Sequence, residues 1–133
     1  ALIVALENAT HHHVSDRIRF MAGDLLMPRP SPVDLIVSNP PYVSADEWAS
    51  LPPSVRDHEP QLALDGGPDG LVAIRQLLAE APAVLRPGGV LLMEIGASQG
   101  EAALELASAY FPQAEARIFT DLSGHDRVLE VQT

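Results

Sequence analysis

The sequence predicts an α/β fold in which an open, mostly parallel sheet carries helices on both faces. Helical periods alternate with short apolar runs along the chain, as in successive βα units. Two of those runs, 33–38 and 90–95, are apolar enough to be strands that are buried on both faces. Two further strand-like segments, 115–120 and 127–131, are joined by a short polar turn, which predicts an antiparallel pair at the C-terminus.

The first half of the chain is expected to begin with a helix over residues 1–9. Apolar side chains recur there at helical spacing, at Leu2, Ala5, Leu6 and Ala9. Residues 17–21 alternate polar and apolar, which predicts a strand. A loop punctuated by Pro28, Pro30 and Pro32 leads to the strand at 33–38.

After the predicted strand at 33–38, segment 43–70 shows little periodicity, and a long irregular segment of this kind is usually functional or disordered in a compact domain. Its single tryptophan, Trp48, is a candidate to anchor it by packing. A helix follows, with an inner face formed by Leu71, Ile74, Leu78, Ala81 and Leu85. Asp69 is its expected cap and Pro82 should break it late. Residues 86–89 read as a turn. Ser98 and Glu101 predict a capping box for the next helix, whose expected inner face is Ala97, Gly100, Leu104, Ala107 and Phe111.

Composition narrows the function classes. A length of 133 residues suggests one domain, 1–133. Eight basic against 18 acidic residues give a formal charge of −10, which argues against a nucleic-acid partner and favours solubility. No apolar run is long enough to cross a membrane, no export signal is visible and cysteine is absent, so we expect a cytoplasmic protein.

The three histidines at 11–13 are badly spaced for metal ligands and are expected to form a solvated helix end, so no metal site is predicted.

Residues Asn39, Pro40, Pro41 and Tyr42 directly follow an apolar strand, and ligands of open α/β sheets bind at such strand ends. The Asn39 carboxamide and the Pro40 carbonyl are hydrogen-bond acceptors that the two prolines hold in place. Tyr42 adds a flat face for a planar group. Two acceptors that grip the hydrogens of an amide nitrogen would orient this poor nucleophile, which points to methyl transfer from a sulfonium to a side-chain amide.

The chain resembles the release-factor glutamine methyltransferases, a family of class I S-adenosylmethionine-dependent enzymes. The matching segments span nearly the whole chain: 17–20, 23–26, 34–42, 58–60, 63–67, 69–71, 86–89, 94–96, 99–100, 121–122 and 126–128. The segment Asn39–Tyr42 alone is shared with adenine-amine methyltransferases, whereas the full set is typical of the glutamine family. The resemblance implies a Rossmann-like class I methyltransferase sheet, of which 1–133 would be the C-terminal portion of the catalytic domain.

The resemblance also implies roles for individual residues. Asn39 to Tyr42 would bind the substrate glutamine, with Asn39, Pro40 and Tyr42 as the catalytic set. Asp24 would lie by the adenine amine, Leu25 would pack on the adenine ring, and Asn39 would lie near the cofactor. Glu59 and Pro60 would brace the neighbouring loop. The family's glycine-rich cofactor loop, ribose-binding acidic residue and first two strands would precede Ala1, so the isolated chain is expected to bind cofactor poorly and to be inactive.

Several functions stay open at this point. The protein substrate implied by the resemblance is a peptide chain release factor, and a ribosomal-protein glutamine is the nearest alternative. An adenine-amine methyltransferase of nucleic acid is another, which the acidic composition disfavours. An alternative of another class is a non-catalytic folding or binding module.

Overall fold

The computed structural model describes residues 1–28 and 32–133, so Arg29 and Pro30 of the proline-punctuated loop lie outside the described residues. The elements, in chain order, are α1 (Leu2–His11), the 3₁₀ turn η1 (Ser15–Arg17), β1 (Val33–Ser38), α2 (Ala45–Trp48), α3 (Pro53–Arg56), α4 (Gln61–Leu64), α5 (Val72–Glu80), η2 (Ala81–Ala83), β2 (Leu85–Glu94), α6 (Gly100–Tyr110), β3 (Glu115–Thr120) and β4 (Asp126–Gln132). Within these residues, no helix is both long and apolar enough to traverse a bilayer.

The four strands form one sheet in the order β1-β2-β4-β3. Strands β1 and β2 are parallel, whereas β2 with β4 and β3 with β4 are antiparallel. The C-terminal antiparallel pair is therefore confirmed, and so is the mixed α/β class. The expectation of a mostly parallel sheet also holds for the direction of the described strands: β1, β2 and β3 run the same way, and β4 alone runs against them, between β2 and β3.

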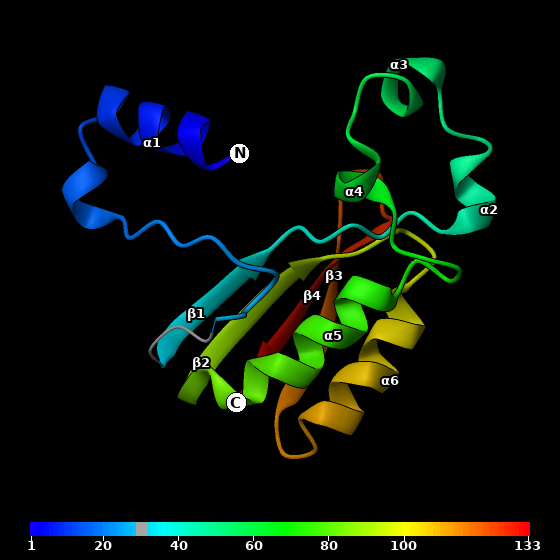
Figure 1. Cartoon of the computed structure of the whole chain (residues 1–133). Coiled ribbons are helices and arrows are strands. Elements are labelled where there is room, and N and C mark those ends of the chain that lie inside the picture. Colours follow the sequence, from blue (N-terminus) through cyan, green and yellow to red (C-terminus); the bar gives the residue numbers. More distant parts are fainter. Residues whose placement is uncertain (29–31) are drawn as a thin grey trace.

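Helices α5 and α6 pack side by side on one face of the sheet (Figure 1). The core lies between them and the strands. Its largest fully buried side chains are Ile74, Leu78, Val84, Leu91, Met93, Ile95, Leu129 and Val131. Four of these side chains come from alternate positions of two strands: Leu91 and Met93 of β2, and Leu129 and Val131 of β4. They share one face of the sheet because successive side chains of a strand point to opposite faces.

The opposite face of the sheet is open, which corrects the prediction that 33–38 is buried on both faces. In β1, Ile36 is buried, but the side chains on either side of it, Leu35 and Val37, are 52% and 70% exposed. No described helix packs over these two residues, and burial of a strand face depends on what covers it. The expected second helical layer is thus absent from the described part of the chain.

The N-terminal prediction is half right. Helix α1 is present, but of the four residues on its expected apolar face only Ala9 is buried. Residues 11–13 are exposed at its end, as expected. The predicted strand at 17–21 is wrong: Ser15–Arg17 form a 3₁₀ turn and the residues after it join no sheet. A strand requires a neighbour for its backbone hydrogen bonds, and none pairs with this segment.

Predictions about helix ends and turns had mixed outcomes. Pro82 ends α5, which gives way to the 3₁₀ turn η2, and Leu85 already begins β2 rather than closing the helix. Residues 86–89 form an irregularity within β2, not a separate turn. The expected capping box at Ser98 is wrong, because α6 begins one residue later, after Gln99, and has no side-chain cap. Asp69 accepts a hydrogen bond from Leu71 N–H at 3.0 Å but is not the cap of α5.

The predicted inner face of α6 is confirmed in part, and segment 43–70 contains more helix than predicted. Gly100, Ala107 and Phe111 are buried as expected, whereas Ala97 is exposed and precedes the helix. Segment 43–70 contains three short helices, α2 to α4, rather than irregular chain alone. A capping box does occur there, between Ser44 and Glu47, and Trp48 is half-buried at the end of α2.

Candidate active site

The chain leaves the sheet at Asn39 because the next two residues cannot continue it. Strand β1 stays in register with β2 as far as Ser38, which lies opposite Met93. Pro40 and Pro41 have no N–H to donate to a ladder, and each restricts the residue before it to extended conformations. The segment therefore runs, extended and stiff, across the carboxyl end of the sheet.

A recess of about 330 Å³ opens where this segment crosses the sheet end. Its walls are formed by Asn39, Pro40, Tyr42, Val43, Glu59, Ala63 and Leu64. The Asn39 side chain is exposed and, among the described residues, makes no hydrogen bond with the protein. Pro40 is buried and Pro41, which is half-buried, does not line the recess. The structure thus brings three of the four predicted substrate-binding residues together around one cavity.

The far wall of the recess is fixed by backbone hydrogen bonds. Val43 N–H donates to the Leu64 carbonyl at 2.9 Å, and Gly66 N–H donates to the Val43 carbonyl at 2.8 Å. These bonds make a short parallel bridge between the segment after β1 and the residues after α4. The residues after α4 are therefore hydrogen-bonded to Val43, which directly follows the predicted Asn39–Tyr42 site.

Tyr42 is held by a residue that the sequence did not reveal as part of the site. Its hydroxyl donates to Glu94 Oε1 at 2.8 Å. Burial, followed by the hydrogen bond to Glu94 and the negative charge of Glu94, raises the pKa of the Tyr42 hydroxyl. Tyr42 is therefore protonated at neutral pH, and its ring is fixed at one edge of the recess. A charged residue at the end of an otherwise apolar strand was the available signal for Glu94.

The raised pKa of Tyr42 predicts a pH effect on stability. A folded-state pKa above the unfolded value makes a contribution that is complete below about pH 10 and is lost as the pH rises through the folded pKa. In the complete polypeptide that carries these residues, the wild-type free energy of unfolding should fall more steeply above about pH 10 than that of Tyr42→Phe. Urea unfolding of both proteins on either side of this pH tests the expectation, and equal slopes would contradict it.

The residues expected at the cofactor lie elsewhere. Asp24 and Met27 form a tight turn through two backbone hydrogen bonds, of 2.9 and 2.8 Å, in which Leu25 has a φ of +47°. Leu25 lines a small recess of about 130 Å³, and neither Asp24 nor Asn39 is among its lining residues. Asp24 is exposed, and no described residue hydrogen-bonds to its carboxylate. The structure does not place this pair in the same recess as Asn39.

The expected loop-bracing hydrogen bond of Glu59 is not found among the described residues. Its carboxylate is exposed at the wall of the recess, and only its backbone N–H bonds, to the Val55 carbonyl at 2.9 Å. The described residues also contain no group of three or more His, Cys, Asp or Glu side chains arranged to hold a metal ion.

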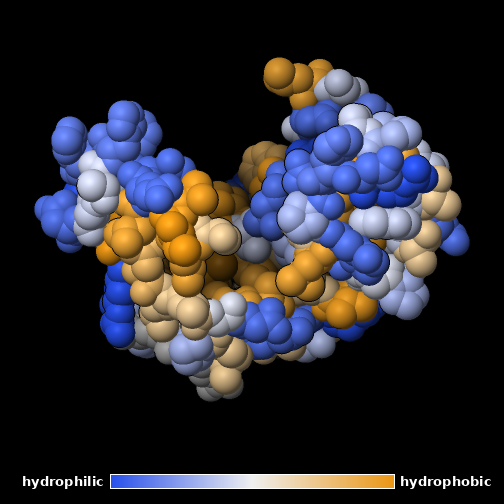
Figure 2. Space-filling view, turned by 45° about the horizontal axis from the view of Figure 1, so that its top comes forward, coloured by the Kyte–Doolittle hydropathy of each residue, from blue (hydrophilic) through white to orange (hydrophobic). Residues whose placement is uncertain are grey.

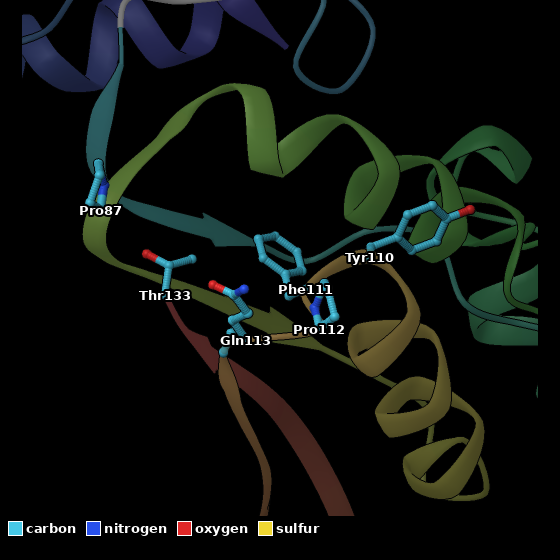
Figure 3. Close-up of a pocket in the computed structure, with 7 residues that line it drawn as sticks. Pro87, Tyr110, Phe111, Pro112, Gln113 and Thr133 are labelled. Carbon is cyan, nitrogen blue, oxygen red and sulfur yellow. The ribbon is translucent and has the colours of Figure 1, made fainter.

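The surface offers a broad hollow and a separate pocket. Figure 2 shows a hollow between α1 and helices α2 to α4, with hydrophobic residues along its floor. The separate pocket, about 400 Å³, lies at the opposite end of the sheet and is lined by Pro87, Tyr110, Phe111, Pro112, Gln113, Ala114 and Thr133 (Figure 3). It contains no predicted site residue, and the Tyr110 hydroxyl is the one ionisable side-chain group that lines it, so the recess at Asn39 is the better candidate.

Known proteins were compared with the chain. No family model matches it. A release factor glutamine methyltransferase from Thermosynechococcus vestitus is 48% identical over 136 residues, covering 100% of this chain and 47% of that protein. Its counterpart from Cereibacter sphaeroides is 48% identical over 132 residues, covering 99% and 47%. The chain thus spans about half the length of the curated relatives it matches.

A solved structure agrees with this similarity. The protein-(glutamine-N5) methyltransferase (release factor-specific) of Alicyclobacillus acidocaldarius superposes with a TM-score of 0.52 and 28% identity, covering 80% of this chain and 52% of that one. The sheet and its helical layer therefore have the fold of a methyltransferase.

Proposed function

We infer that this chain belongs with the release factor glutamine methyltransferases, which it resembles along its whole length, and we propose that it forms part of an enzyme that methylates a glutamine side chain. The observation that carries the proposal is the recess at the end of β1. Asn39 lines it with a carboxamide that bonds to no described residue, Pro40 lines it with a proline-fixed backbone, and Tyr42 forms its edge.

The chemistry follows from what these groups can do to a primary amide. The lone pair of an amide nitrogen is delocalised, so the nitrogen is a weak nucleophile. The Asn39 Oδ1 and Pro40 carbonyl oxygens accept the two amide hydrogens and favour the positive charge that develops on nitrogen. The Tyr42 ring packs against the amide plane, and positioning supplies the rest of the rate enhancement. The nitrogen loses its proton after transfer, so no strong base is required.

The proposed cofactor is S-adenosylmethionine, whose sulfonium supplies an electrophilic methyl group when bound. At the adenine end, the chemistry of the chain fits. Asp24 has an exposed carboxylate that can accept from an exocyclic amine, and Leu25 is a half-buried aliphatic side chain beside it. Asn39 also lines a recess over the open sheet face with Val37, Leu92 and Val128, where it would contact the bound cofactor.

The proposed substrate is a protein, and a peptide chain release factor is the substrate that the relatives' name indicates. Acidic side chains gather near the recess, on and between α2, α3 and α5: Asp46, Glu47, Asp57, Glu59, Asp65 and Asp69. Two arginines, Arg56 and Arg75, accompany them, each paired with one of these carboxylates. Because the backbone of nucleic acid is bound through cationic side chains, this surface disfavours an adenine-amine substrate. A translation-factor substrate would place the reaction in the cytoplasm.

The proposal is tested by substrate competition. The complete polypeptide is incubated with S-adenosylmethionine labelled in its methyl group and with a release factor, a ribosomal protein or a duplex oligonucleotide. We expect label in the release factor, and none there once its candidate glutamine is replaced by asparagine. Label in the oligonucleotide alone would overturn the protein-substrate assignment, and label in the ribosomal protein alone would move the substrate to its sibling class. No transfer to any of the three would favour a non-catalytic binding module.

A further inference from the structure

Gln99, the residue just before α6, is a polar side chain in the interior. It is 6% exposed, and it is the one buried polar or charged residue in the described ranges, 1–28 and 32–133. Burying a polar side chain lowers the stability of the fold unless its donors and acceptors form hydrogen bonds with neighbouring groups. The partners of Gln99 therefore indicate what its burial achieves.

Those partners join three separate segments of the chain. Gln99 Oε1 accepts a hydrogen bond from Gly96 N–H at 2.8 Å. Gln99 Nε2 donates to the backbone carbonyl of Tyr42 at 2.9 Å and to that of Gly70 at 3.2 Å. One carboxamide thus connects the end of β2, the segment that follows β1 and the loop before α5.

Glycines let these segments come this close. A Cβ added to Gly70 would lie 2.5 Å from both Gln99 Nε2 and the Tyr42 carbonyl oxygen, and one added to Gly66 would lie 2.8 Å from the Tyr42 Cα. A Cβ on Gly96 would lie 3.0 Å from Gln99 Oε1. Any side chain at Gly66 or Gly70 would therefore push the backbone of Tyr42 away from Gln99.

Tyr42 is consequently fixed at two points. Glu94 holds its hydroxyl, and Gln99 holds its carbonyl. The two prolines before it transmit that position along a stiff backbone to Asn39 and Pro40. We propose that Gln99 is a positioning residue that sets the Asn39–Tyr42 segment for catalysis; its effect on methyl transfer rests on the proposed function. Gln99 itself does not line the recess.

Two substitutions of similar shape separate its hydrogen bonds. Gln99→Met removes all three. Gln99→Glu keeps an acceptor for Gly96 N–H, but an ionised carboxylate cannot donate to the Tyr42 and Gly70 carbonyls. Because a displacement of about 1 Å can cost about 10² in rate, both variants should lose about 100-fold in kcat, while the dissociation constant of S-adenosylmethionine stays unchanged.

The pH dependence of kcat in Gln99→Glu distinguishes a positioning role from a purely structural one. Burial raises the pKa of a carboxyl group, so lowering the pH gives the glutamate of Gln99→Glu a proton that it can donate to Tyr42. The kcat of Gln99→Glu relative to wild type should therefore rise as the pH falls. That of Gln99→Met should stay low at every pH.

Val131→Ala is the matched control, because Val131 is fully buried in β4, opposite Leu91 and Ala116, and does not line the recess. It lowers stability without touching the segment. All variants are assayed in the complete polypeptide, well below their melting temperatures. A loss of kcat in the Gln99 variants no greater than in Val131→Ala would overturn the proposal, as would a pH profile of Gln99→Glu that matches Gln99→Met.

Failure of the proposed function would be recognised separately, because the wild type would then methylate no glutamine. If the wild type methylates no glutamine, hydrogen exchange at the backbone amides of Val43 and Gly66 still tests whether Gln99 positions the segment. Faster exchange in Gln99→Met than in Val131→Ala supports the positioning role, and equal exchange overturns it.

Discussion

Replacing Asn39 by alanine should lower kcat for glutamine methylation by about 10² to 10³, the usual effect of losing one preorganised polar group in an active site. The side chain is exposed at the recess and makes no hydrogen bond with any described residue, so its loss should leave the fold intact. Of the two proposed acceptors, it is the only one that a substitution can remove, since the other is the backbone carbonyl of Pro40.

Single-turnover methylation of a glutamine-containing peptide by the complete polypeptide measures this effect. Ser38→Ala is the control, because it changes the neighbouring residue at the end of β1 and should keep near-normal turnover. Unfolding curves of both variants should overlay the wild-type curve. An Asn39→Ala protein that retains more than half of the normal turnover would rule out the amide-binding role.

Replacing Gly70 by alanine should damage stability and activity together. Gly70 has a φ of +73°, where a side chain costs about 1–2 kcal/mol, and its added Cβ would lie 2.5 Å from the Tyr42 carbonyl oxygen. Overpacking against the backbone adds about 1–3 kcal/mol, so we expect a total loss of about 2–5 kcal/mol in the free energy of unfolding. Displacement of Tyr42 should also lower kcat.

Gly88→Ala separates the two contributions. Gly88 has a similar φ of +78°, but a Cβ there would meet nothing within 4 Å. It should lose only the conformational part, about 1–2 kcal/mol, and keep normal kcat. Chemical unfolding and turnover of the two variants provide the comparison. Equal losses in both would show that the close approach of Gly70 to Tyr42 has no energetic consequence.

Local patterns predicted the parts of the fold that depend on local chemistry. The strands at 33–38 and 115–120 have the predicted bounds, and Pro82 ends α5 because its ring cannot fit a helix interior. Residues 17–21 alternate as a strand does, yet no neighbouring strand supplies hydrogen bonds. Exposure of Leu35 and Val37 could not be predicted either, because it depends on what packs on the sheet rather than on β1 itself.

The candidate site divides in the same way. The Asn39–Tyr42 segment was predictable, since its prolines and the strand before it act within a few residues. Glu94 and Gln99, which fix Tyr42, are 52 and 57 positions away, and no local pattern connects them with it. The roles of Asp24 and Leu25 at the cofactor stay predictions, because they rest on the resemblance and neither residue lines the recess at Asn39; Leu25 lines a different one.

The most direct test of the account is a crystal structure of the complete polypeptide with S-adenosylhomocysteine and a glutamine-containing peptide. We expect the glutamine side-chain nitrogen within about 2.7–3.2 Å of both Asn39 Oδ1 and the Pro40 carbonyl oxygen, with its amide plane against the Tyr42 ring. A glutamine side chain bound outside the recess of Asn39, Pro40 and Tyr42, or bound there with its nitrogen turned away from both oxygens, would contradict the account.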